Sequence, residues 1–173
     1  MKSRRRVNST VVRLFPPNMT RDEIRNVIDD YLALVESDDG DLENREATLK
    51  GALDRLALAY HFADFTFDES SYPDAPQSDY AALRKRVETR FPNYGYYNTP
   101  NEITTNLEQS KMLVGDAIDD IADIARDLRE VVWCWDNTSV EDALWHFKFG
   151  YESHWGMHLR CLQLYLLALN WGQ

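Results

Sequence analysis

The sequence is short of several residue types, and each shortage excludes a class of protein. Its 173 residues contain two cysteines, Cys134 and Cys161, with no Cys-x-x-Cys pair, so a disulfide framework is excluded. Both lie among apolar residues, which predicts buried thiols in a reducing compartment. Seven glycines and six prolines are too few for a fold made of many tight turns, and favour long regular elements.

The sequence also lacks an apolar run long enough to cross a membrane. The longest uncharged stretch, residues 161–173, has 13 residues, whereas a bilayer requires about 20. The basic segment from Met1 to Arg6 is not followed by an apolar core, so a secretory signal is not expected. We therefore expect a cytoplasmic protein with no membrane partner.

Charge of one sign dominates the chain. The formal net charge is −10, which repels phosphate backbones and makes nucleic acid an unlikely partner. The same charge favours solubility and attraction to basic protein surfaces. Hydrophobic residues make up 44% of the chain, enough for a single core. We expect one domain over residues 20–173, preceded by an N-terminal arm over residues 1–19.

Helical periodicity accounts for most of the chain. Residues 7–15 are expected to form a short strand or extended arm, and residues 92–98 a tyrosine-rich loop. Short connections between helices predict an all-α fold, an antiparallel bundle of four to five helices with a short extended N-terminal arm. Apolar residues recur three or four positions apart in the segments that carry these helices: residues 21–37, 42–62, 79–91, 102–133 and from 140 almost to the C-terminus.

Helix starts are marked by a repeated local motif. In a capping box, a Thr oxygen and a Glu carboxylate three residues later each accept an N–H that the first helical turn leaves without a partner. Pro100 suits the first position of a helix, where its missing N–H costs nothing. The motif occurs at Thr20–Glu23, Thr99–Glu102 and Thr138–Glu141.

Two segments resemble a known family. Residues 114–130 (VGDAIDDIADIARDLRE) form an acidic helix, and residues 143–158 (ALWHFKFGYESHWGMH) contain an Ala-Leu-Trp segment and a His-Trp-Gly-x-His segment. In these features the chain resembles a bacterial helical family known as domain of unknown function 5063. The likeness is best over residues 103–169. It implies a helical fold and a bacterial origin, and it supplies no activity.

His154 and His158 are the sharpest chemical feature. One helical turn separates them, so both imidazoles lie on one face of the last helix, along its apolar stripe. Their spacing matches a pair of metal ligands. The zinc-protease motif is excluded because Trp155, and not Glu, follows His154. A divalent metal site and a pair of core histidines bonded to carboxylates or carbonyls remain, and the sequence favours the core pair.

An acidic stripe offers further ligands. Its face lies opposite the apolar stripe, which predicts a solvated surface, and magnesium binding is the alternative. Glu43 and Glu46 repeat a carboxylate spacing seen in all-helical nucleoside-triphosphate pyrophosphohydrolases, although here the two carboxylate pairs are far apart in sequence. The stripe consists of Asp116, Asp119, Asp120, Asp123 and Asp127.

Aromatic residues suggest contact surfaces. Tyr94, Tyr96 and Tyr97 lie in one loop that either rims a pocket or partner surface or covers the end of the bundle. Trp145 and Phe149 give the last helix a second apolar face, which indicates a central helix or a homodimer interface.

Two function classes follow. The sequence favours a non-catalytic interaction or regulatory module that binds a protein partner, which the acidic charge suggests is basic. The alternative is a metal-dependent enzyme or small-ligand-binding protein. In that alternative His154 and His158 converge with Asp116 or Asp120, and Arg160 binds an anionic ligand. The sequence does not decide whether the protein is an enzyme.

Overall fold

Helices α4 and α5 form the hairpin around which the rest of the fold is built. The computed structural model describes residues 18–37, 42–109 and 111–169. Helix α4 (Ala117–Asn137) turns back at Thr138 into α5 (Val140–Gly150). A π-helical turn, η2 (Tyr151–Trp155), joins α5 without a break to α6 (Gly156–Leu169), so the last helical segment is continuous, as predicted.

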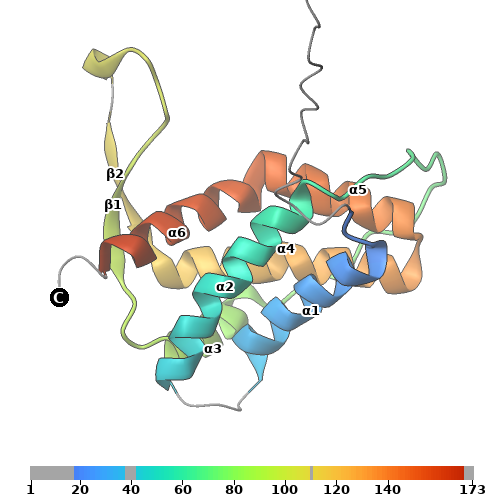
Figure 1. The fold of residues 1–173 in the computed structure, drawn as a ribbon, viewed down its shortest axis with the longest axis horizontal. Helices are drawn as coiled ribbons and strands as arrows, with labels where there is room; N and C mark the ends of the chain where they lie inside the picture. The colour runs from blue at the N-terminus through green and yellow to red at the C-terminus, as the bar shows by residue number, and fades with distance from the viewer. Residues whose placement is uncertain (1–17, 38–41, 110, 170–173) are drawn as a thin grey trace, which may run out of the picture.

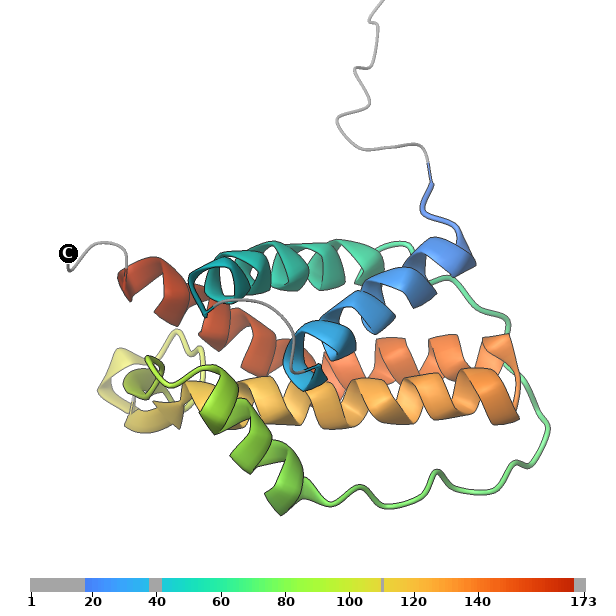
Figure 2. The ribbon, with the colours of Figure 1, turned by 90° about the horizontal axis from the view of Figure 1, so that it is seen from below.

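The remaining helices cover this hairpin on two sides. Helix α4 contacts α1 (Arg21–Glu36), α3 (Tyr80–Arg90), α5 and α6, whereas α2 (Leu42–Tyr60) lies against α1 and α6. Figure 2 shows α1 and α2 together on one side of the α4–α5 pair, and α3 on the other. The prediction of a mainly helical fold is confirmed. Among the described helices, none combines the length and apolar character that crossing a bilayer requires.

Helix α1 shows why the helix predictions succeed. The Glu23 amide donates to Thr20 Oγ1 at 3.2 Å, and the Thr20 amide donates to Glu23 Oε2 at 2.7 Å, which closes the predicted capping box. The core side of the helix then follows its period of 3.6 residues. Its buried residues are Ile24, Val27, Ile28, Tyr31 and Val35.

The helix predicted over residues 102–133 is wrong in its first part. Strands β1 (Tyr96–Pro100) and β2 (Met112–Asp116) pair antiparallel, with a short 3-10 turn η1 (Leu107–Gln109) in the loop between them, and α4 begins only at Ala117. Thr99 therefore lies in a strand and caps no helix. The strand ladder supplies the backbone partners that the predicted cap would have given. This β1–β2 hairpin stands out from the helical body (Figure 1).

The third predicted capping box is displaced by one residue. Ser139, and not Thr138, caps α5, because the Asp142 amide donates to Ser139 Oγ at 3.1 Å. The Thr138 amide donates to the Cys134 carbonyl and ends α4. The expected arm over residues 7–15 lies outside the described residues, and the division at residue 20 stays a prediction.

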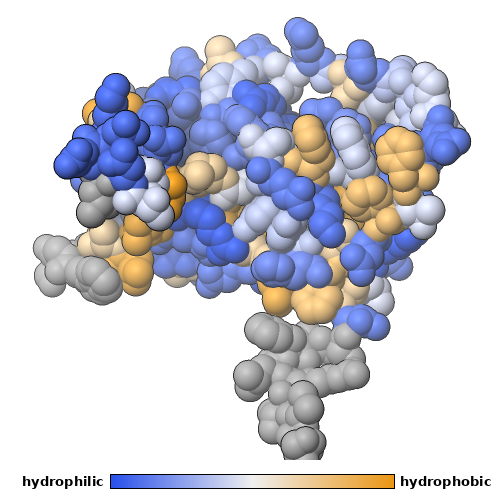
Figure 3. All heavy atoms as spheres, turned by 90° about the horizontal axis from the view of Figure 1, so that it is seen from above, coloured by the Kyte–Doolittle hydropathy of each residue, from blue (hydrophilic) through white to orange (hydrophobic). Residues whose placement is uncertain are grey.

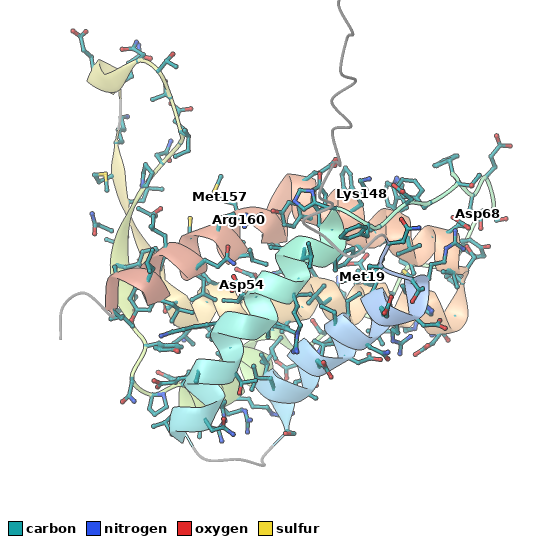
Figure 4. All side chains as sticks on the ribbon, viewed as in Figure 1. Met19, Asp54, Asp68, Lys148, Met157 and Arg160 are labelled. Atoms are coloured by element: carbon teal, nitrogen blue, oxygen red, sulfur yellow. The ribbon has the colours of Figure 1, made fainter. Side chains whose placement is uncertain are left out.

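A strap of irregular chain closes the far end of the α4–α5 hairpin. Residues 63–79 contain neither helix nor strand and run from the end of α2 to the start of α3. Asp68 lies on this strap beside the beginning of α5 (Figure 4), where its carboxylate accepts hydrogen bonds from Ser139 Oγ at 2.6 Å and Tyr72 at 2.8 Å. The strap is thereby fixed to the N-terminal end of α5.

Candidate metal centre

Three histidines from one helical segment meet three carboxylates of α4. In each pair the imidazole Nδ1 faces the carboxylate, at distances of 2.7–3.3 Å. Because α4 runs antiparallel to α5 and α6, the pairs follow one another along the contact between the helices. We call this set the histidine ladder: His146–Glu130, His154–Asp127 and His158–Asp120.

Of the two histidines that the sequence singles out, His158 has the less exposed side chain. Its Nδ1 lies 2.8 Å from Asp120 Oδ1, and its Nε2 lies 3.7 Å from Asp123 Oδ2. Hydrogen bonding to Asp120 outweighs burial and raises the pKa of His158. A proton on Nδ1 leaves the Nε2 lone pair facing Asp123, which is the arrangement of a histidine ligand held by an outer carboxylate.

His154 lies one turn earlier, within η2. Its Nδ1 is 2.7 Å from Asp127 Oδ2, and its ring centroid is 4.8 Å from that of His158. One ligand atom from each of His154, His158 and Asp123 can be chosen so that all three lie within 4.8 Å of one another. The His pair therefore converges with a carboxylate on one point.

Burial and charge distinguish this point from an ordinary surface ion pair. Asp120 and Asp123 are only 6% and 7% exposed, and burial raises the pKa of Asp123. Three carboxylates, from Asp120, Asp123 and Asp127, meet here with one arginine, Arg126, which lies 2.9 Å from Asp123 and 3.1 Å from Asp127. The three carboxylates thus exceed the fixed positive charge of Arg126, and a protonated histidine or a bound cation offsets the difference.

The acidic stripe of α4 is therefore not the solvated surface that its position opposite the apolar stripe predicted. The continuous segment α5–η2–α6 packs on α4 and covers Asp120 and Asp123. The β1–β2 hairpin adds Tyr97, which donates a hydrogen bond to Asp120. Tyr97 reaches it across Gly115, where a Cβ atom would lie 2.5 Å from the tyrosine ring.

The π turn sets the phase of the ladder. His146 and His154 are eight residues apart, which in an unbroken α-helix would leave them about 80° out of phase. In η2 the Gly156 amide reaches back to the Tyr151 carbonyl, five residues earlier, so the turn takes up one extra residue. Both histidines can then face α4.

A cleft of about 230 Å³ opens between the His154–Asp127 and His146–Glu130 pairs of the ladder. Trp145 and Phe149, predicted as partner contacts, form one of its walls with their rings stacked 5.0 Å apart. His154 and His146 line the same cleft. The structure therefore brings this predicted aromatic pair together with His154, while His158 does not line the cleft.

Two other predicted ligands lie elsewhere. Asp116 caps the start of α4 through the Ile118 amide and forms an ion pair with Arg84 at 2.5 Å. Arg160 lies on the side of α6 that faces α2 (Figure 4), and its guanidinium donates to the Tyr151 hydroxyl at 2.8 Å. Neither contributes to the point where His154, His158 and Asp123 meet.

The loop predicted over residues 92–98 is wrong from Tyr96 onward, where strand β1 begins, and its tyrosines lie in three environments. Tyr94 is buried and stacks on Phe91, whereas Tyr97 is half-buried between Tyr165 and Asp120. Tyr96 is 75% exposed on the hairpin. The loop thus covers the end of the bundle with two of its rings and presents the third to solvent.

The carboxylate spacing on α2 belongs to a different region. Glu46 accepts a hydrogen bond from Asn93 at 3.0 Å, in the loop after α3. Nothing is described of the Glu43 side chain. The described part of this pair therefore joins α2 to the α3 loop.

Two features of the site were missed in the sequence. The sequence places Asp123 and Asp127 in the acidic stripe, but matching them to the histidines requires the alignment of α4 with α6. The second feature is the His146–Glu130 end of the ladder, where hydrogen bonding to Cys134 and Glu130 raises the pKa of His146 to about 10. The signal for it in the sequence is the shortness of the turn at Thr138, which joins α4 and α5 as a helical hairpin and brings residues of its two arms together.

Comparisons with known proteins agree with the fold and leave the activity open. The family described as a domain of unknown function (DUF5063) matches residues 17–169. A crystal structure of protein BF1032 from Bacteroides fragilis is similar to the chain, with 21% sequence identity and a TM-score of 0.56, over 86% of this chain and 90% of that chain. Among curated proteins none matches significantly.

Proposed function

We propose that this chain, which belongs to the family described as domain of unknown function DUF5063, binds a divalent transition-metal ion between His154, His158 and Asp123. The single observation that supports this proposal most strongly is the orientation of the two histidines. In both imidazoles Nδ1 is hydrogen-bonded to a carboxylate of α4. One ligand atom from each histidine and one from Asp123 lie within 4.8 Å of one another.

The donor set selects the class of metal. Two imidazole nitrogens and one carboxylate oxygen suit Zn²⁺, Ni²⁺, Fe²⁺ or Mn²⁺ better than Mg²⁺, which prefers oxygen ligands and retains its waters. The outer carboxylates, Asp120 and Asp127, would hold the rings in place and increase the basicity of the ligand nitrogens. A cation would also offset the excess of negative charge at this point.

The number of protein ligands suits an exchangeable fourth ligand. Three protein ligands with an open position are typical of sites where a metal polarises a substrate or activates water, whereas structural zinc sites have four. His154 also lines the 230 Å³ cleft with Trp145 and Phe149. A small ligand with one metal-binding group and one apolar part fits this arrangement, so we assign the site to ligand binding or metal-assisted hydrolysis.

Metal binding is tested by titrating chelator-treated protein with Zn²⁺ and Mn²⁺ in a calorimeter. We expect His158→Ala to bind one ion fewer per chain than the unchanged protein, and Asp120→Asn to bind it about 10–100-fold more weakly. His61→Ala is the matched control, because His61 is exposed at the end of α2 and belongs to no part of the ladder. If His158→Ala binds as many ions as the His61 control with equal affinity, the proposal is wrong.

A second function, self-association, is favoured by the β1–β2 hairpin. It carries an exposed group of apolar side chains, and within the described residues each of its strands is paired on one edge only. Seen from above, hydrophobic residues lie beside the base of the hairpin, next to its hydrophilic tip (Figure 3). The most exposed apolar residues of the hairpin are Tyr96, Ile103, Met112 and Val114.

We propose that a second copy of the chain pairs with an unpaired strand edge of the β1–β2 hairpin. Two identical strands can pair antiparallel about a two-fold axis, and an uncovered apolar edge favours such pairing. Sedimentation of the protein should show a dimer that Val114→Asp reduces to a monomer, while Leu164→Asp on the exposed side of α6 leaves it intact. A monomer at high protein concentration would contradict this second function without bearing on the metal site.

A further inference from the structure

The His146–Glu130 end of the histidine ladder carries a second set of possible ligand atoms. Cys134 lies one turn after Glu130 on α4, and Asp142 lies one turn before His146 on α5. The turn at Thr138 places these two pairs opposite each other. Atoms of Cys134, Asp142 and His146, one from each residue, lie within 4.8 Å of one another.

Neighbouring groups orient two of these three residues. Glu130 Oε1 lies 3.3 Å from His146 Nδ1, so His146 Nε2 is left facing Asp142 Oδ1 at 3.8 Å. The Thr138 hydroxyl donates to Asp142 Oδ2 at 2.7 Å and leaves Oδ1 free for a ligand. This arrangement repeats that of His158, whose Nδ1 is held by one carboxylate while Nε2 faces another.

A small, partly open pocket adjoins these atoms. It has a volume of about 130 Å³ and is bounded by Glu130, Cys134, Asp142 and His146 on one side and by the strap on the other. Asp68 fixes the strap there through Ser139 and Tyr72. The cavity has room for a metal ion and for a water molecule as a fourth ligand.

The surrounding charge favours a cation over a free thiolate. Cys134 is 3% exposed, and a thiolate there would stand beside the carboxylates of Asp142 and Glu130. Like charges at close range cost free energy, which either a protonated His146 or a divalent cation bound between them offsets. Sulfur is a soft ligand and selects Zn²⁺ and similar ions over Mg²⁺ or Ca²⁺.

We propose that Cys134, Asp142 and His146 form a second metal site, specific for a thiophilic divalent ion such as Zn²⁺, in the cavity beneath the strap. The site does not depend on the His154–His158 centre, because the two share no ligand. Glu130 and Thr138 are positioning residues, which hold His146 and Asp142 without touching the ion.

Cobalt substitution tests this proposal in the full chain. Co²⁺ bound to a thiolate gives a near-ultraviolet charge-transfer band, which a site made only of nitrogen and oxygen ligands does not produce. We expect the band in the unchanged protein and in His154→Ala/His158→Ala, and its loss in Cys134→Ser. Cys161→Ser, which alters the other cysteine, should keep it.

Thiol modification gives a second readout that needs no variant at Cys134. In the unchanged protein we expect Zn²⁺ to protect Cys134 from alkylation, measured by mass spectrometry of its peptide, while alkylation of Cys161 proceeds. Absence of the cobalt band at saturating Co²⁺, or alkylation of Cys134 at the same rate with and without Zn²⁺, would overturn the proposal. Persistence of the band in the double histidine variant separates this result from the fate of the first site.

Discussion

The Tyr97 hydroxyl donates a hydrogen bond to the Asp120 carboxylate, whose other oxygen holds His158 Nδ1 at 2.8 Å. A residue of the β1–β2 hairpin is thereby connected to the candidate metal centre through one carboxylate. The sequence analysis does not predict the β1–β2 hairpin, so the place of Tyr97 beside the metal centre could not be derived from the sequence.

Tyr97→Phe should weaken metal binding without removing a ligand. The variant keeps the ring that stacks on Tyr165 and loses the hydroxyl, and with it the hydrogen bond that orients Asp120 and a contact with Cys161. We expect metal affinity to fall by about tenfold or less, the lower end of the effect of outer-sphere partners, and the free energy of unfolding to fall by about 1 kcal/mol. Calorimetry with Zn²⁺ and urea denaturation measure the two effects.

Tyr96→Phe is the matched control for this prediction, since Tyr96 precedes Tyr97 on the same strand and its ring is exposed. It should bind metal as the unchanged protein does. Equal affinities for Tyr97→Phe and Tyr96→Phe would show that the hydrogen bond to Asp120 has no part in positioning His158.

Asp68 should make the attachment of the strap depend on acid. Hydrogen bonds from Ser139, Ser70 and Tyr72 hold the pKa of its carboxyl well below its ordinary value. Because the folded pKa is the lower one, the stability that Asp68 contributes is fully present above the pKa of an unfolded aspartate, about 3.9. It is lost as the pH falls below that value toward the folded pKa.

The comparison of Asp68→Asn with the unchanged protein tests this dependence by urea denaturation at several pH values. At pH 7 the variant should be the less stable protein, and the difference should shrink as the pH is lowered from 5 to 3. Asp64→Asn, at an exposed position on the same strap, should show no such trend. A difference that stays constant across this range would contradict the assignment.

Gly156→Ala should strain the π turn. A Cβ at this position would lie 2.2 Å from the Tyr151 carbonyl oxygen, and a backbone atom cannot move aside as a side chain can. We expect a loss of about 1–3 kcal/mol in the free energy of unfolding, the range typical of overpacked sites. Thermal and urea denaturation both report it.

Gly51→Ala provides the opposite case within the same molecule. Gly51 lies inside α2, and a Cβ there would meet nothing within 4 Å. Alanine should therefore raise the free energy of unfolding by about 0.5–1 kcal/mol, because it restricts the unfolded chain and favours the helix. If both substitutions changed stability alike, the contact with the Tyr151 carbonyl would not be the cause.

The sequence predicts the helices well where local signals decide them. The ends of α1, α2 and α3 lie within two residues of the predicted ones, because capping residues and apolar periodicity act over a few positions. The β1–β2 hairpin is not predicted, because its strands are separated by a long loop with no tight-turn motif. Thr99 and Glu102 imitate a helix cap, and the register that overrides them is a long-range pairing.

The candidate site is predicted in part for the same reason. His154 and His158 follow from their spacing on one helix. Their partners depend on how α4 aligns with α6, so Asp123 and Asp127 could not be separated from Asp116 by spacing alone. The burial of Asp120 likewise depends on Tyr97 and α6, which cover a face that its own helix leaves polar.

The π turn has a consequence for insertions and deletions. Since η2 takes up one residue more than an α-helical turn, removing the exposed Ser153 should convert it to regular α-helix and leave His146, His154 and His158 facing α4. Adding an alanine after Ser153 should instead turn α6 by about 100° and move both later histidines off the α4 face. Length variation at this position is therefore tolerated in one direction only.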